Sequence, residues 1–210
     1  MMTDENHISR YVHITADGIL LNGEMVYQPD HKSGVDMLVD AYKHCGYTSA
    51  KFYKMDSLCK LAILASELLL RDLDLAAAYQ PDEIAVIVST AHSSLDTDRR
   101  YWESVKAAAP SPSLFVYTLP NVMLGEICIR WGIKGENTCL VSETFDSTFQ
   151  TDYVNSLIET DNAKTCISGW ADYLDGKMDA FFMLVEKNHS SLGQHNPLTV
   201  KKLYDRTWKN

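Results

Sequence analysis

Hydroxyl side chains gather after a short apolar run in residues 137–148, NTCLVSETFDST. Ser142, Thr144 and Ser147 follow the run, and the nearest thiol, Cys139, lies several residues earlier within it. In an α/β enzyme, a strand that breaks into a polar helix start often presents a nucleophile at the turn. The chemistry to consider is therefore acyl transfer or hydrolysis.

A hydroxyl nucleophile needs a general base, and no motif in the sequence identifies one. No Gly-x-Ser-x-Gly elbow occurs, and no acid–histidine pair can be assigned by spacing. His13 is typical of a surface or satisfied loop position, and no catalytic motif surrounds His189 or His195. His92 follows a predicted strand and is the histidine that could face a pocket.

Alternating strand and helix patterns must position these groups. Strands are predicted at 11–20 (with a turn), 84–90, 138–142, 164–168 and 179–187. Helices are predicted around 35–44, within 55–73, between Pro120 and Gly132, at 149–158 and from about Leu198. This order predicts an α/β fold with a sheet of about five strands and helices on both faces.

Several residues predict where elements begin and end. Asp56 or Ser57 can cap the helix within 55–73, and Pro120 suits the first turn of a later helix. Gly132 suits the end of that helix, and Gly169 interrupts the strand that begins near 164.

Composition limits the class of protein. The chain has 210 residues, 46% of them apolar, and a formal charge of −9, which argues against binding nucleic acid. No apolar run is long enough to span a membrane, and the polar first ten residues are unlike a secretory signal. Five scattered cysteines without a CxxC motif predict reduced thiols and a cytoplasmic protein, and no motif indicates a metal or cofactor.

A family resemblance enters at residues 118–135, TLPNVMLGEICIRWGIKG. This segment resembles the N-terminal half of a β-ketoacyl synthase, a member of the thiolase superfamily. The shared landmarks are Pro120, Asn121, Gly125, Ile127, Ile129, Gly132, Lys134 and Gly135. The Met-Asp helix in 52–66, the strand in 82–90 and the segments 163–174 and 179–187 also resemble the family in order. The resemblance implies half of a thiolase-like fold in residues 1–187 with a mixed sheet, and a tail at 188–210 that forms a linker and a short helix.

The resemblance also implies that the chain lacks the family's nucleophile. In active members a cysteine at a helix start attacks the acyl thioester, and counting from Gly135 puts Thr144 at that position. Two further histidines come from the second half of the fold, and the sequence ends where that half would begin. The segment LVSET instead resembles the chain-length-factor branch, in which a glutamine replaces the cysteine. Leu140, Val141 and Glu143 match this branch, whereas Thr144 departs from its glutamine.

These features predict a non-catalytic subunit that pairs with an active ketosynthase in type II fatty acid, polyketide or polyene synthesis. The partner would supply the 3-oxoacyl-(acyl-carrier-protein) synthase activity and most of the carrier-protein docking. The expected pairing strand is Thr138, Cys139, Leu140, Val141, Ser142 and Glu143. The expected pocket residues are Thr144, Phe145, Phe149, Met123 and His92. An apolar layer of the half-fold would be covered by the tail helix, by a partner, or by both.

Two alternatives remain open from the sequence. One is a stand-alone acyltransferase or hydrolase that uses Ser142, Thr144 or Ser147. The other is a homodimeric descendant of the family that binds an acyl group or has a structural role.

Overall fold

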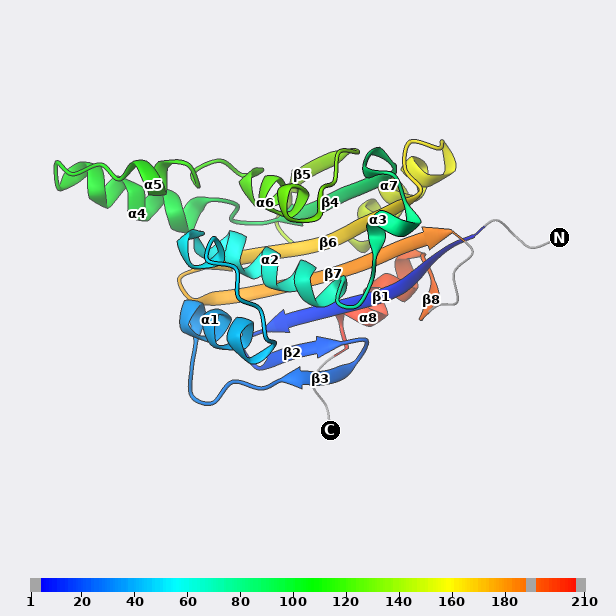
Figure 1. The fold of residues 1–210 in the computed structure, drawn as a ribbon, viewed down its shortest axis with the longest axis horizontal. Coiled ribbons are helices and arrows are strands. Elements are labelled where there is room, and N and C mark those ends of the chain that lie inside the picture. Colours follow the sequence, from blue (N-terminus) through cyan, green and yellow to red (C-terminus); the bar gives the residue numbers. More distant parts are fainter. Residues whose placement is uncertain (1–4, 188–191, 207–210) are drawn as a thin grey trace.

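The sheet has more strands than the five predicted. The structure is a computed structural model, and it describes residues 5–187 and 192–206. In these residues eight strands form one mixed sheet of order β3-β2-β1-β7-β6-β4-β5, with β8 paired to β1 (Figure 1). The strands are β1 (Asn6–Thr15), β2 (Gly18–Leu21), β3 (Glu24–Tyr27), β4 (Ile84–Thr90), β5 (Asn137–Val141), β6 (Thr165–Leu174), β7 (Lys177–Lys187) and β8 (Gly193–Gln194). β4 runs parallel to β5 and β6, and the other pairs are antiparallel.

The additional strands come mainly from the N-terminal segment. The strand predicted at 11–20 is the end of β1, a turn, and most of β2. The chain then reverses at Asn22 and Gly23, whose φ angles are 54° and 89°, and continues as β3. An Asn-Gly pair favours this kind of tight hairpin because both residues tolerate positive φ. The prediction was also wrong at Gly169, which lies inside the ten-residue strand β6 and does not end it.

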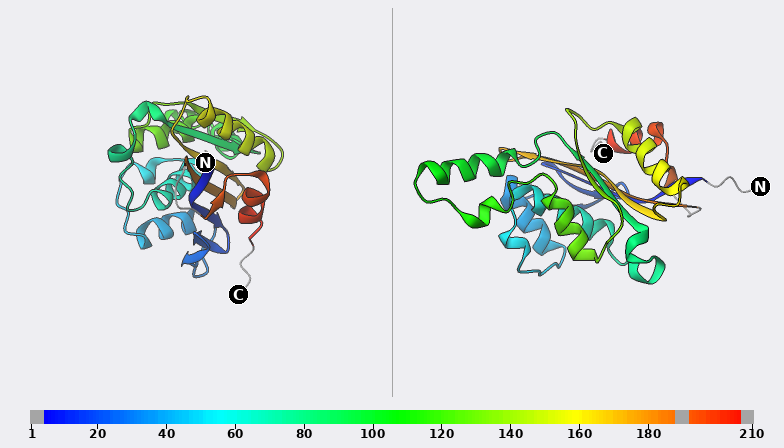
Figure 2. Two further views of the ribbon diagram at one scale, coloured as in Figure 1. Left: turned by 90° about the vertical axis from the view of Figure 1, so that its right-hand side faces the viewer. Right: turned by 90° about the horizontal axis from the view of Figure 1, so that it is seen from above.

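Helices cover both faces of the sheet, as predicted (Figures 1 and 2). The helices are α1 (Gly34–His44), α2 (Ser57–Leu69), α3 (Leu75–Ala78), α4 (Leu95–Lys106), α5 (Pro112–Phe115), α6 (Val122–Trp131), α7 (Ser147–Glu159) and α8 (Pro197–Tyr204), with 3-10 turns at Phe52–Lys54 and Pro81–Glu83. One apolar cluster packs α1, α2 and α6 against one face, and a second packs α7 and α8 against the other. The α4–α5 segment projects beyond the end of the sheet as an arm (Figure 1).

Helix α2 is the centre of the first layer, and all thirteen of its residues are buried. Its apolar face was predictable from periodicity, but its polar residues are buried as well. Glu67 is only 3% exposed and pairs with Arg130, whose Nε lies 2.6 Å from a carboxylate oxygen. Asp56 caps the helix, because its carboxylate accepts a hydrogen bond from the backbone N–H of Cys59. Buried polar groups at these positions are thus satisfied within the layer.

The boundaries of α6 differ from the prediction at one end. Gly132 closes the helix with a φ of 68°, the left-handed conformation expected of a glycine at this position. Pro120 lies outside the first turn, since Asn121 is the N-cap and the helix begins at Val122. The reason is a preceding turn, in which the N–H of Val122 donates to the carbonyl of Leu119.

The tail helix α8 covers part of the second face. Val200 is fully buried, and the ring of Tyr204 lies 4.7 Å from that of Phe145 and 5.6 Å from that of Phe181. The helix starts at Pro197, one residue before the predicted start, with Asn196 as its cap. His189 lies outside the described residues. None of the described helices is both long and apolar enough to traverse a bilayer.

Two glycines give a matched test of the close contact between strands β6 and β7. A Cβ at Gly169 would lie 1.9 Å from the carbonyl oxygen of Phe181 on β7, whereas a Cβ at Gly125 would meet nothing within 4 Å. We expect Gly169→Ala to lower the free energy of unfolding by about 3 kcal/mol or more, because β6 and β7 must separate. Gly125→Ala should raise it by up to about 1 kcal/mol through helix propensity. Urea unfolding measures both, and an unchanged midpoint for Gly169→Ala would contradict the register of β6 and β7.

Candidate functional site

The turn after β5 holds the hydroxyls that the sequence singles out. Thr144 and Glu143 are exposed, and the hydroxyl of Ser142 donates to the carbonyl oxygen of Thr144 at 2.9 Å. The backbone N–H of Ser142 donates to the carbonyl of Thr90, which fixes this turn beside the end of β4. The hydroxyl of Ser142 is therefore used as a donor within the turn itself.

The first amides of α7 are already occupied. Asp146 is the N-cap, and one oxygen of its carboxylate accepts hydrogen bonds from the N–H groups of Thr148 and Phe149, both at 3.0 Å. A helix N-terminus stabilises a nearby anion through these unpaired N–H groups. Here the anion is a side chain of the chain itself. Thr144 lies two residues before the cap, so it receives no such stabilisation.

Cys139 has the properties of a core thiol. Its sulfur lies 3.6 Å from the carbonyl oxygen of Pro120, and burial raises its pKa to about 11. The thiolate is the nucleophilic form of cysteine, and at neutral pH it is almost absent from a group with this pKa. Cys139 therefore does not replace the missing nucleophile.

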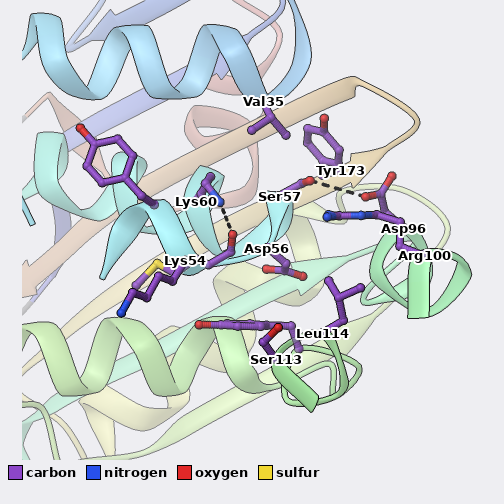
Figure 3. Close-up of a pocket in the computed structure, with 13 residues that line it drawn as sticks. Val35, Lys54, Asp56, Ser57, Lys60, Asp96, Arg100, Ser113, Leu114 and Tyr173 are labelled. Atoms are coloured by element: carbon purple, nitrogen blue, oxygen red, sulfur yellow. Dashed lines mark hydrogen bonds between the residues drawn. The ribbon is translucent and has the colours of Figure 1, made fainter. Parts of the chain in front are cut away.

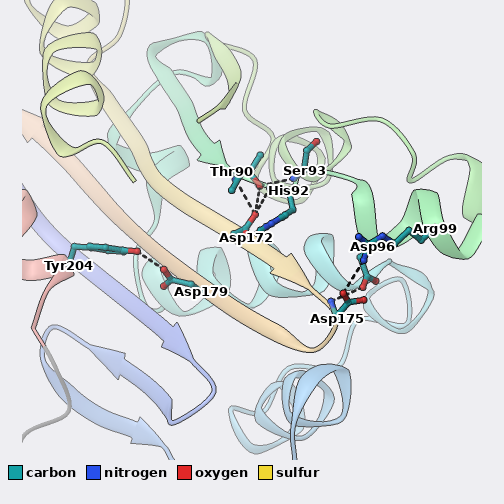
Figure 4. A network of polar contacts seen from close by, with 10 residues as sticks. Thr90, His92, Ser93, Asp96, Arg99, Asp172, Asp175, Asp179 and Tyr204 are labelled. Carbon is teal, nitrogen blue, oxygen red and sulfur yellow. Dashed lines mark hydrogen bonds and ion pairs between the residues drawn. The ribbon is translucent and has the colours of Figure 1, made fainter. Parts of the chain in front are cut away.

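Asp172, at the end of β6, organises the turn that follows β4 (Figure 4). One oxygen of its carboxylate accepts hydrogen bonds from the Thr90 hydroxyl and from the N–H groups of Ala91 and His92, at 2.8–3.0 Å. The other oxygen lies 2.7 Å from Nδ1 of His92. An Asp–His pair of this kind can orient an imidazole for proton transfer. The sequence offered no signal for it, because the partners are eighty residues apart.

A second carboxylate lies directly opposite Asp172 in the sheet. Asp179 on β7 is its antiparallel register partner. Asp179 accepts a hydrogen bond from the Tyr204 hydroxyl at 2.5 Å and lies 2.9 Å from Nε2 of His13. His92, Asp172 and Asp179 share a cavity of about 330 Å³. The two facing carboxylates are thus tolerated because each has its own donors.

The structure separates the predicted pocket residues. Phe149 is half-exposed and lines a cavity of about 270 Å³ that it shares with Ser142. Phe145 is buried beneath α8, and Met123 is buried on the opposite face of the sheet. His92 belongs to the cavity at the ends of β6 and β7. Phe149 is therefore the predicted residue that the structure places in a cavity beside the turn.

A buried amide in the same cavity was not foreseen. Gln150 is 1% exposed, and its Nε2 donates to the carbonyl of Ile87 at 2.7 Å and to the hydroxyl of Ser168 at 2.9 Å. Ser89 donates to its Oε1 at 3.4 Å. These bonds tie α7 to the centre of the sheet. A glutamine inside an apolar helical face was the available sequence signal.

Among the described residues, strand β5 is an edge of the sheet and pairs with β4 alone. Its residues are only partly buried, and Val141 is 65% exposed. The strand ends at Val141, so Ser142 and Glu143, which the sequence analysis included in the pairing strand, lie beyond it. An unpaired edge with an exposed apolar side chain can add a strand from another chain.

His195 has a structural position. It is 2% exposed, and its Nδ1 lies 2.8 Å from the side-chain oxygen of Asn155 on α7. Its N–H donates to the carbonyl of Asn6, so this residue ties the tail to both β1 and α7. Burial lowers its pKa to about 4. Among the described residues, no group of three His, Cys, Asp or Glu side chains could hold a metal ion.

Comparison with solved structures identifies the fold. The chain is similar to "The ishigamide ketosynthase/chain length factor" (TM-score 0.65, 15% identity, covering 90% of this chain and 63% of that chain). It is also similar to a β-ketoacyl synthase from Burkholderia phymatum STM815 (TM-score 0.59, 12% identity, 88% and 59% covered). The chain thus spans about 60% of the length of these two proteins.

A third similar structure is a ketosynthase (ApeO) in complex with its chain length factor (ApeC) from Xenorhabdus doucetiae. The TM-score is 0.55 and the identity 12%, with 96% of this chain and 91% of that chain covered. No family model and no curated protein matches the sequence. The chain therefore has the fold of ketosynthases and chain length factors, as its sequence motifs predicted.

The occupied helix start and the missing base predict an inert turn. We expect no mass increase when the protein is incubated with a medium-chain acyl thioester, because residues 5–187 and 192–206 place no base beside the hydroxyls of the turn. Intact-protein mass spectrometry measures the adduct, and Ser142→Ala and Thr144→Ala serve as controls. An acyl adduct that either substitution abolishes would show that the turn is reactive.

The buried imidazole of His195 predicts a pH dependence of stability. The unfolded state binds a proton near pH 6.5, whereas the folded state does so only near pH 4. The free energy of unfolding should therefore fall by up to about 3 kcal/mol as the pH drops through this window. His195→Gln should remove this part of the slope, and His31→Gln, at a side chain that is 98% exposed, should not. Equal slopes in the two variants would refute the assignment.

Proposed function

We propose that this chain is a non-catalytic, chain-length-factor-like subunit that pairs with an active ketosynthase. The observation that carries the proposal is the end of β5. There no described strand pairs with the outer edge, while the turn that follows has an exposed threonine and a helix start already capped by Asp146. Such an end is suited to association and unsuited to nucleophilic attack.

The length of the matched proteins supports this proposal. The ketosynthase–chain length factor complex of Xenorhabdus doucetiae includes a chain of about the same length as this one, because the match covers 91% of it. A chain of this size can therefore have a place in such a complex. The pathway, whether fatty acid, polyketide or polyene synthesis, would follow from the partner.

Exposed apolar side chains give the surface that a partner would cover. Val141 and Phe149 both line the cavity at the end of β5. On the arm, the exposed apolar residues are Trp102, Phe115, Val116 and Leu119, each 55–59% exposed. Large exposed apolar side chains of this kind usually mark an interface. The partner would also carry out the condensation and most of the carrier-protein docking.

Within this proposal the pocket residues have different roles. Phe149 and Thr144 lie at the turn and would form part of the wall of the partner's acyl tunnel. Phe145 and Met123 would act through packing, since both are buried. The five cysteines are free, which supports a reducing, cytoplasmic location.

The alternatives make different demands on the same residues. A stand-alone hydrolase would need a base at Ser142 or Thr144, but the hydrogen bonds of His92 and His195 go to Asp172 and Asn155. A homodimer would use the same edge strand with a second copy of the chain. The homodimer therefore differs from the proposed heterodimer in the identity of the partner and not in the surface that is used.

A charge at the strand edge tests the proposal. Val141→Lys should prevent co-purification with a co-expressed ketosynthase, because a buried, unpaired lysine opposes strand pairing. Met25→Lys is the matched control, since Met25 is 46% exposed on β3 at the opposite edge of the sheet. Light scattering after size exclusion gives the composition of each complex. A heterodimer that survives Val141→Lys would contradict the proposed interface, and a wild-type homodimer would favour self-association.

A further inference from the structure

A cavity of about 590 Å³ lies between the first turn of α2 and the α4–α5 arm (Figure 3). Its lining comes from α1, the turn before α2, the start of α2, α4, α5 and the end of β6. The cavity lies apart from the β5 turn, and the proposed function does not use it. Its volume is sufficient for a small organic molecule.

Three cations line this cavity, and none of them has a carboxylate partner among the residues that the structure describes. Lys60 is 7% exposed, and its ammonium donates to the carbonyl of Met55. Burial, opposed by the charge of Asp56, lowers the pKa of Lys60. Arg100 extends from α4 toward Asp56 and Ser57, while Lys54 lies at the margin (Figure 3). Within the described part of the chain, the side chains of Arg100 and Lys54 form no hydrogen bond or ion pair.

The two carboxylates of the cavity are engaged by other groups. Asp56 accepts the N–H of Cys59 at 2.9 Å with one oxygen and the Thr97 hydroxyl at 2.6 Å with the other. Asp96 accepts the backbone N–H of Asp175 at 3.2 Å and faces the Ser57 hydroxyl at 3.5 Å. The cations therefore stay unpaired in a chain whose formal charge is −9. Buried or converging cations normally have an anionic partner.

Neutral groups complete the lining. The Ser57 and Ser113 side chains supply hydroxyls, and three tyrosines, Tyr53, Tyr117 and Tyr173, contribute rings. Ser57 and Tyr173 are buried, which gives the inner end of the cavity a fixed shape. A guanidinium and an ammonium beside hydroxyls recognise phosphate oxygens, and aromatic rings suit an attached apolar or planar group.

We propose that this cavity binds a small phosphate monoester, with the phosphate between Arg100 and Lys60 and its organic group beside the tyrosines. Arg100 supplies paired N–H donors, and Lys60 supplies a point charge held in place by Met55. The site is independent of pairing with a ketosynthase.

Titration of the full chain with phenyl phosphate, followed by amide chemical shifts, tests the proposal. Saturable shifts should be centred on Ser57, Ser113 and Tyr173, and inorganic phosphate should bind the same place more weakly because it lacks the ring. Arg100→Gln should weaken binding about tenfold or more, the effect of losing one charge-assisted contact. Arg99→Gln is the matched control, since Arg99 is the neighbouring arginine of α4 and pairs with Asp175 at 2.9 Å, outside the cavity.

The second variant, Lys60→Met, keeps the length of the side chain and removes its charge. It should also weaken binding, and circular dichroism will confirm that each variant is folded. Equal weakening by Arg99→Gln and Arg100→Gln would indicate general surface attraction and overturn the proposal. Absence of saturable binding at millimolar phenyl phosphate, or shifts centred outside the cavity, would also overturn it.

Discussion

Strands β4 and β7 bury nearly all of their side chains on both faces, and this constraint determines what the remaining elements must do. A strand buried on both sides requires a helical layer above and below it. α1, α2 and α6 form one layer, while α7 and the tail helix α8 form the other. Val200 and Tyr204 of α8 pack over the second core. The sequence analysis expected the tail helix, a partner or both to cover an apolar layer, and α8 covers part of it. Among the described residues, the sheet keeps two edges, β3 and β5, and the β5 edge is the one beside the turn.

The polar groups at the ends of the parallel strands already form hydrogen bonds with the neighbouring turns. In open α/β sheets this end commonly holds the ligand site. Here Asp172 binds the turn after β4, and Asp146 binds the first amides of α7. A carboxylate in such a position stabilises the turn but removes the donors that an oxyanion would need. The same interactions therefore favour a stable scaffold and disfavour catalysis.

Sequence periodicity predicted the long elements but not the short ones. α2 and β4 were evident because their apolar patterns run for many residues, and Gly132 marked a helix end through its backbone freedom. β2 and β3 have four residues each, too few for a pattern, and the prediction did not use the Asn22-Gly23 pair between them as a hairpin signal. The edge position of β5 and the fold itself were implied by the family resemblance.

Much of the candidate site could not be foreseen, because it depends on tertiary contacts. The Asp172–His92 pair joins residues far apart in the chain, and the cavity around Lys60 needs the arm to fold back toward α2. The separation of Phe145, Phe149 and Met123 also follows from packing, since their exposure is set by the sheet face on which each one falls. From residue type alone, all three were equally good candidates for a pocket.

Amide hydrogen exchange across residues 138–141 tests the central claim most directly. Outward-facing N–H groups of an unpaired edge strand exchange rapidly, and pairing with a second chain protects them. We expect these amides to exchange fast in the isolated protein and to slow strongly when an active ketosynthase is added, with little change at β3. Unchanged exchange along β5 in a complex that has formed would contradict the account.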